Sequence, residues 1–167
     1  RGGPAGVTRG DARLEGADLA GAGDRARAEA GNPELATSVT KDAVFPIISA
    51  ENPVAADIIA EGISQETFNK IFVSGEIKTW GEVVGKPEVT DEIHVYTRSD
   101  ACGAGEMWAK FSGGKVQDDI KGIGINGEPA LVDTVLKDPL GIGFGNLNSV
   151  FDLGSGDLVP GIIIPPI

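Results

Sequence analysis

The sequence predicts an α/β fold in which a mostly parallel sheet is flanked by helices. Short apolar segments typical of β-strands alternate along the chain with segments whose apolar residues have helical spacing. This alternation is typical of βαβ units, whose strands run parallel. The length of 167 residues and the hydrophobic content of 41% suffice for one domain, or two small lobes, with a buried core.

Each predicted element depends on a local pattern. Strands are predicted at residues 42–49, 93–97 and 140–144, followed by a last extended piece after residue 152. Helices are predicted at residues 54–61, 65–73, 106–111 and 129–137. Ser64 is expected to cap the second of these helices, and Pro129 suits the first turn of the last one. A turn or short helix is predicted around Trp80, Val83 and Val84, and Trp80 and Trp108 are expected in the core.

The first 40 residues differ in composition from the rest of the chain. Five of the six arginines lie there and no lysine does, while the first aromatic residue is Phe45. Because large apolar residues are so few, the segment cannot build a core alone. We interpret residues 1–40 as a linker, as the remnant of a first lobe, or as a stretch whose sequence is misread. The chain opens on Arg1 without an apolar leader, so we expect a processed or excised fragment.

The charge and the rare residue types exclude several classes of function. The chain has 25 acidic and 14 basic residues, a net charge of -11, whereas nucleic-acid binding needs clustered Lys and Arg. No apolar stretch is long enough to span a membrane. The single cysteine, Cys102, excludes an internal disulfide framework, and the single histidine, His94, excludes zinc motifs built on histidine pairs. No metal and no cofactor are expected.

One segment has the pattern of an anion-binding site. A predicted strand ends near Thr97, small residues follow, and a helix begins near Cys102. Free backbone N–H groups at a helix start point outward at the positive end of the helix dipole, and small residues let an anion approach them. Arg98 adds a cation whose forked N–H groups match an oxyanion. The expected ligand-binding residues are Arg98, Ser99, Asp100, Cys102, Gly103 and Ala104.

The same residues allow two other interpretations. Their spacing also fits a capped helix that carries a surface pair between Arg98 and Asp100. A catalytic interpretation would make Cys102 a nucleophile and His94 its base, because a thiol at a helix start beside an arginine is activated. His94 lies upstream on a predicted strand, at the sheet surface or edge. This position favours a small Cys102 that is buried under the helix.

The run from Thr97 to Gly103 resembles the Arg-x-Asp-x-Ser-Gly-Thr signature of substrate-binding proteins of phosphate-type ABC transporters. Other stretches agree with this resemblance and follow in the same order. Residues 39–44 resemble the family's strand that leaves its first lobe, and residues 52–53 resemble its Asn-Pro turn. Residues 71–80 resemble its Ile-Phe-x-Gly-x-Ile-x-x-Trp stretch, and residues 142–144 resemble its Ile-Gly-Tyr strand. The resemblance covers roughly residues 38–152.

The resemblance implies a periplasmic binding protein-like lobe that binds an inorganic oxyanion, with phosphate as the expected ligand. It implies that residues 41–150 form the second α/β lobe of such a protein and that residues 151–167 return toward the first. It also implies an extracytoplasmic location, periplasmic or anchored at the cell surface. The anion would be delivered to the membrane permease of an ABC transporter without chemistry on the ligand.

Two positions depart from the signature. Cys102 and Ala104 stand where the family commonly has serine and threonine, so two hydroxyl donors are missing. Backbone N–H groups at Gly103 and Ala104 remain available to an anion. Two other functions fit the same lobe. One is an oxyanion-sensing or interaction domain without a role in transport, and the other is an enzyme that uses Cys102.

Overall fold

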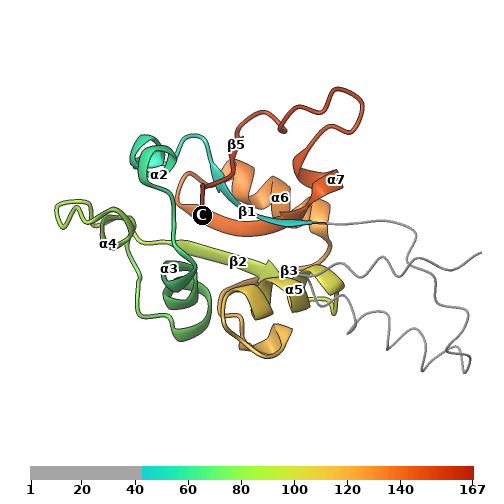
Figure 1. Ribbon diagram of the computed structural model, residues 1–167, viewed down its shortest axis with the longest axis horizontal. Helices are drawn as coiled ribbons and strands as arrows, with labels where there is room; N and C mark the ends of the chain where they lie inside the picture. Colours follow the sequence, from blue (N-terminus) through green and yellow to red (C-terminus); the bar gives the residue numbers. More distant parts are fainter. Residues whose placement is uncertain (1–42) are drawn as a thin grey trace, which may run out of the picture. The chain divides into compact units, whose positions relative to one another are not determined.

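Five strands form one sheet in the computed structural model, which describes residues 43–167 (Figure 1). They are β1 (Val44–Ser49), β2 (His94–Arg98), β3 (Ile123–Ile125), β4 (Gly141–Asn146) and β5 (Ile162–Ile163), in the spatial order β3-β2-β4-β1-β5. β2 pairs in parallel with β3 and β4, whereas β1 pairs antiparallel with β4 and β5. Four of these five strands therefore point the same way, which confirms the predicted mostly parallel α/β sheet.

Helices cover both faces of this sheet, and Figure 1 shows α3 and α5 on one side and α6 on the other. The first face carries α2 (Ala55–Glu61), α3 (Gln65–Asn69), the π-helical turn η1 (Lys70–Ser74), α4 (Trp80–Val84) and α5 (Gly103–Phe111). The second face carries α6 (Glu128–Lys137) and α7 (Leu147–Val150). A 3-10 turn, η2 (Gln117–Asp119), follows α5. None of the helices described is long and apolar enough to cross a membrane.

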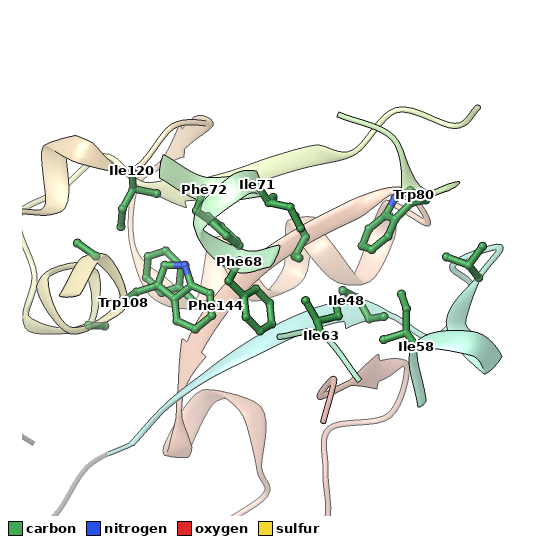
Figure 2. Packing of buried hydrophobic residues seen from close by; sticks show 14 residues of the cluster. Ile48, Ile58, Ile63, Phe68, Ile71, Phe72, Trp80, Trp108, Ile120 and Phe144 are labelled. Atoms are coloured by element: carbon green, nitrogen blue, oxygen red, sulfur yellow. The ribbon is translucent and has the colours of Figure 1, made fainter. Parts of the chain in front are cut away.

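The larger core lies between the sheet and the α2–α5 layer (Figure 2). Trp80 and Trp108 are 0% and 2% exposed, which confirms their predicted burial. The rings of Phe68 and Phe72 meet the Trp108 ring edge-on, with centroids 5.3 and 5.2 Å apart. Phe144 of β4 stacks on the same indole at 5.7 Å. This aromatic cluster therefore fixes α5 against the central part of the sheet.

Local signals explain most element boundaries. The Ser64 hydroxyl accepts a hydrogen bond from the Thr67 amide, which confirms the predicted cap. The predicted helix at residues 65–73 is divided into α3 and the π-helical η1, and Gly75 ends it with a left-handed φ of 70°. α6 has its proline in the first turn, as predicted. The predicted last extended piece forms β5, which pairs with β1.

Three elements were not predicted from the sequence, namely β3, η2 and α7. β3 is three residues long and its Ile123 is 59% exposed, so it has no apolar alternation that a pattern could reveal. The interpretation of residues 1–40 lies outside the described residues. The described residues belong to one compact unit that begins at Asp42. The predicted second lobe, residues 41–150, and the predicted return segment, residues 151–167, remain predictions.

Glycines in β4 let α6 lie close to the sheet. Ile142 and Phe144 face the larger core, so Gly143 and Gly145 face α6 and α7. A Cβ atom added at Gly143 would lie 2.8 Å from Leu131 Cδ2 and 2.9 Å from Val135 Cγ2. Both of these α6 side chains are fully buried. The glycine interruptions of this strand are therefore a packing requirement.

Replacing Gly143 by alanine should destabilise the fold. Overpacking of a filled core costs about 1–3 kcal/mol, and we expect Gly143→Ala to lower the free energy of unfolding by that amount in urea titrations. Gly103→Ala is the matched control, because a Cβ at Gly103 meets nothing within 4 Å. Equal stability of the two variants would contradict the close packing of α6 on β4.

Candidate anion-binding site at the carboxyl end of β2

The carboxyl end of β2 lies where the order of the strands reverses. After β2 the chain forms α5 and then β3 on one side of β2, and after β3 it forms α6 and then β4 on the other side. Because α5 and α6 cover opposite faces, both helices begin at the same edge of the sheet, on either side of β2. Ligands of open α/β sheets bind at such reversals.

Arg98, the last residue of β2, is held at this edge by two carboxylates. Its side chain is 9% exposed. Nε donates to Asp100 Oδ1 at 2.9 Å and Nη2 donates to Asp100 Oδ2, while Nη1 lies 3.5 Å from Glu128 Oε2. The hydrogen bond to Asp100 raises the pKa of Arg98 above its ordinary value. Arg98 therefore remains a cation at any physiological pH.

Asp100 connects the starts of the two helices. Besides Arg98, its Oδ1 accepts a hydrogen bond from the Gly127 amide at 3.0 Å, at the N-cap of α6. The Arg98 guanidinium and then the Gly127 amide hold the pKa of the Asp100 carboxyl well below its usual range. The predicted alternative of an Arg98–Asp100 pair is thus present, and it lies between the helix starts.

Gln117 holds the loop between β2 and α5, a role that sequence patterns missed. Its Nε2 donates to the carbonyl oxygens of Arg98 and Asp100 at 3.1 and 2.8 Å. Its Oε1 accepts from the Cys102 amide at 3.1 Å. A Cβ atom at Gly105 would overlap the Gln117 side chain, so a glycine is needed at this position. Gln117 lies 15 positions after Cys102, so no local motif could have revealed it.

The start of α5 offers backbone donors. Cys102 is the N-cap, and its Sγ accepts from the Gly105 amide at 3.3 Å. Within the described residues, the amides of Gly103 and Ala104 have no hydrogen-bond acceptor, as expected for the first turn of a helix. Ser99 is exposed, and its backbone amide bonds to Ile125 of β3 at 3.0 Å.

The structure therefore brings all six predicted residues to one edge of the sheet. Arg98 and Asp100 are paired, Cys102 caps α5, and Gly103 and Ala104 supply its first free amides. Cys102 is partly buried against the larger core, as the structural interpretation of this residue expected. Binding of an anion by these residues remains a prediction. Glu128, which sequence reasoning also missed, is a further member of the cluster.

The catalytic pair of Cys102 and His94 does not form. His94 begins β2, whereas Cys102 follows the end of that strand, and four strand steps of about 3.3 Å separate His94 from Arg98. His94 Nδ1 lies 2.7 Å from Asp138 Oδ2, which also accepts from the Tyr96 hydroxyl at 2.7 Å. Burial, followed by the contact with Asp138, raises the pKa of Tyr96 to about 12. His94 is thus part of a separate exposed cluster.

Two further features of the described residues lie apart from this edge. A groove of about 370 Å³ lies near the amino end of β2. It is lined by apolar residues such as Ile77 and Ile93 and by the polar residues Lys78, Glu92, His94 and Lys121. None of the six predicted residues lines it. Within residues 43–167, no group of three or more His, Cys, Asp or Glu side chains is arranged to hold a metal ion.

A comparison with protein-family models finds one whose description is the PBP superfamily domain, and it matches residues 2–157. The chain belongs to this family. A search of the curated proteins finds no match.

Solved structures with the same fold include three proteins that are described as phosphate-binding or phosphate-transport proteins. An ABC-type phosphate transport receptor from Vibrio cholerae is 18% identical, with a TM-score of 0.57 over 74% of this chain and 45% of that one. A putative phosphate ABC transporter substrate-binding protein with bound phosphate from Clostridium perfringens is 21% identical, with a TM-score of 0.54 over 65% and 41%. A possible phosphate binding protein from Planctomyces limnophilus is 18% identical, with a TM-score of 0.51 over 63% and 36%. The alignments thus cover less than half of each of these proteins.

Replacing Asp100 by asparagine should change the acid stability. Because the pKa of Asp100 is lower in the folded state, its carboxylate stabilises the fold above the unfolded value of about 3.9, and this contribution is lost as the pH falls through the lower folded value. In urea titrations Asp100→Asn should be less stable than the unsubstituted chain at pH 7, and the difference should shrink below about pH 4. Asp118→Asn controls for the loss of one exposed negative charge. A difference that persists unchanged down to pH 2 would contradict this pairing.

Cys102 should act as a helix cap. Removal of an N-cap acceptor costs about 0.5–2 kcal/mol, so Cys102→Ala should lower the free energy of unfolding by that amount. Cys102→Ser keeps an acceptor at the same position and should retain the stability of the unsubstituted chain. Thermal unfolding that does not distinguish the two variants would exclude the capping role.

Proposed function

We propose that this PBP superfamily domain binds an inorganic oxyanion, with phosphate as the first candidate, and delivers it to the membrane permease of an ABC transporter. The proposal places the protein outside the cytoplasm, without a cofactor and without chemistry on the ligand. The observation that carries it is the position of Arg98. The only arginine after residue 27 is nearly buried at the strand-order reversal, beside the free amides that begin α5. The choice of phosphate is supported by the three solved structures of the same fold, which are described as phosphate-binding or phosphate-transport proteins.

The donors suit an anion whose hydration shell is removed in part. Arg98 contributes charge-assisted hydrogen bonds, and the amides of Gly103 and Ala104 contribute neutral ones at the positive end of α5. The net charge of -11 does not oppose such binding, because mobile ions screen distant charges beyond about 8–10 Å. Selectivity would then depend on short-range donors. Ser99 can add a hydroxyl, whereas Cys102 and Ala104 supply none.

Binding by the 167-residue chain alone should be weak. An anion held at one edge of the sheet remains partly in water, where each hydrogen bond nets about 0.5–1.5 kcal/mol, or about 1.5–3 kcal/mol when it is charged. Three or four such bonds give millimolar affinity, about 4 kcal/mol short of a micromolar site. We therefore expect the full affinity only where further donors enclose the anion from the other side.

Arg98→Ala tests the proposed site. In NMR titrations of the isotope-labelled chain, phosphate should shift the amide signals of Gly103 and Ala104 with a millimolar Kd. Loss of a charged partner costs about 2–5 kcal/mol, so the shifts should vanish in Arg98→Ala. Lys137→Ala is the matched control, because it removes one exposed positive charge at the other end of α6.

Titration of Arg98→Ala that matches the unsubstituted chain would remove Arg98 from the site. The transport role has its own test, since deletion of the gene should lower phosphate uptake in the source organism. Unchanged uptake with intact binding would favour an oxyanion-sensing or interaction domain.

A further inference from the structure

We propose that Glu128 is a positioning residue that fixes the Arg98 guanidinium for its anion, a role that rests on the proposed function. Glu128 is the first residue of α6, and its side chain is 13% exposed. Its Oε2 faces Arg98 Nη1 at 3.5 Å, and its Oε1 accepts from the Asn146 amide. The carboxylate thus has one partner on β2 and another at the end of β4.

The contacts of Arg98 define what remains for a ligand. A guanidinium has five N–H groups. Two bond to Asp100, from Nε and Nη2, and Nη1 forms an ion pair with Glu128 Oε2 at 3.5 Å. In the described part of the chain this leaves three N–H groups without a hydrogen bond, two on Nη1 beside Glu128 and one on Nη2. Their direction is set by the two carboxylates, so an anion meets them in one orientation.

The two carboxylates differ in how firmly they are placed. Asp100 lies in the loop between β2 and α5, on the chain segment of Arg98 itself. Glu128 lies on α6, whose Leu131 and Val135 are fully buried against the sheet. Glu128 therefore ties the guanidinium to α6 directly, whereas Asp100 is connected to α6 through the Gly127 amide. Positioning of this kind matters because an anion gains most from donors that are already in place.

Charge alone predicts the opposite effect for Glu128. A carboxylate near an anion repels it, so a Glu128 that acted only through its charge would weaken binding. Its removal would then strengthen phosphate binding, and glutamine and alanine would have similar effects. A positioning role predicts instead that alanine weakens binding. Glutamine has a single oxygen, which can replace one of the two carboxylate oxygens toward Asn146 or Arg98, so it should restore part of the binding.

The test compares Glu128→Ala, Glu128→Gln and the control Asp133→Ala in the 167-residue chain. Asp133 lies on the same helix, is exposed and pairs with Lys137. We expect Glu128→Ala to raise the Kd for phosphate about ten-fold or more in NMR titrations, with Glu128→Gln between Glu128→Ala and the unsubstituted chain and Asp133→Ala unchanged. Without phosphate, the Arg98 Nη signals should be separate in the unsubstituted chain and should merge in Glu128→Ala, because the guanidinium rotates more freely.

Each outcome decides between the two proposals. If Arg98→Ala abolishes binding while Glu128→Ala binds phosphate as tightly as the unsubstituted chain or more tightly, the positioning role is wrong and the proposed function stands. If the unsubstituted chain shows no phosphate-dependent shift at all, both proposals fail for this ligand. If Glu128→Ala does not fold, Glu128→Gln carries the test. A Kd for Glu128→Gln equal to or below that of the unsubstituted chain, with Arg98 Nη signals that stay separate in this variant, would then overturn the role.

Discussion

The close approach of α6 to β4 is the constraint on which the site depends. Gly143 and Gly145 present no side chains to the helix, so Leu131, Val132 and Val135 pack directly on the strand. This contact places the first turn of α6, with Gly127 and Glu128, beside the end of β2. With larger residues in β4 the helix would move away from the sheet, and Arg98 would lose one of its two carboxylates.

The order of the strands then determines which groups meet. Because β2 lies between β3 and β4, the chain leaves β2 on one face and leaves β3 on the other, and both helix starts meet at one edge. Asp100 joins them through Arg98 and the Gly127 amide, and Gln117 holds the loop that carries both residues. The cation and the free amides thus come from one short segment, residues 98–104. Gln117, Gly127 and Glu128, which lie further along the chain, hold this segment in place and fix the cation in direction.

Sequence patterns predicted the fold class, and they predicted that the six candidate residues lie together at one edge of the sheet, because those features depend on local signals. Alternating apolar residues identified β2, and the change from a strand to small residues and a helix identified the start of α5. β3 escaped prediction because it is short and exposed, and Glu128 and Gln117 escaped because their partners lie far along the chain. Contacts between residues on different strands could not be predicted without the order of the strands in the sheet. The role of Gly143 likewise depends on which helix packs on that strand.

Crystals of the 167-residue chain grown with arsenate, a phosphate analogue with anomalous scattering, test the central claim most directly. We expect a single strong anomalous peak at the carboxyl end of β2, within hydrogen-bond distance of Arg98 and of the amides of Gly103 and Ala104. A peak at another place in the described structure, with Arg98 bound only to Asp100 and Glu128, would contradict the claim that this edge of the sheet binds the anion.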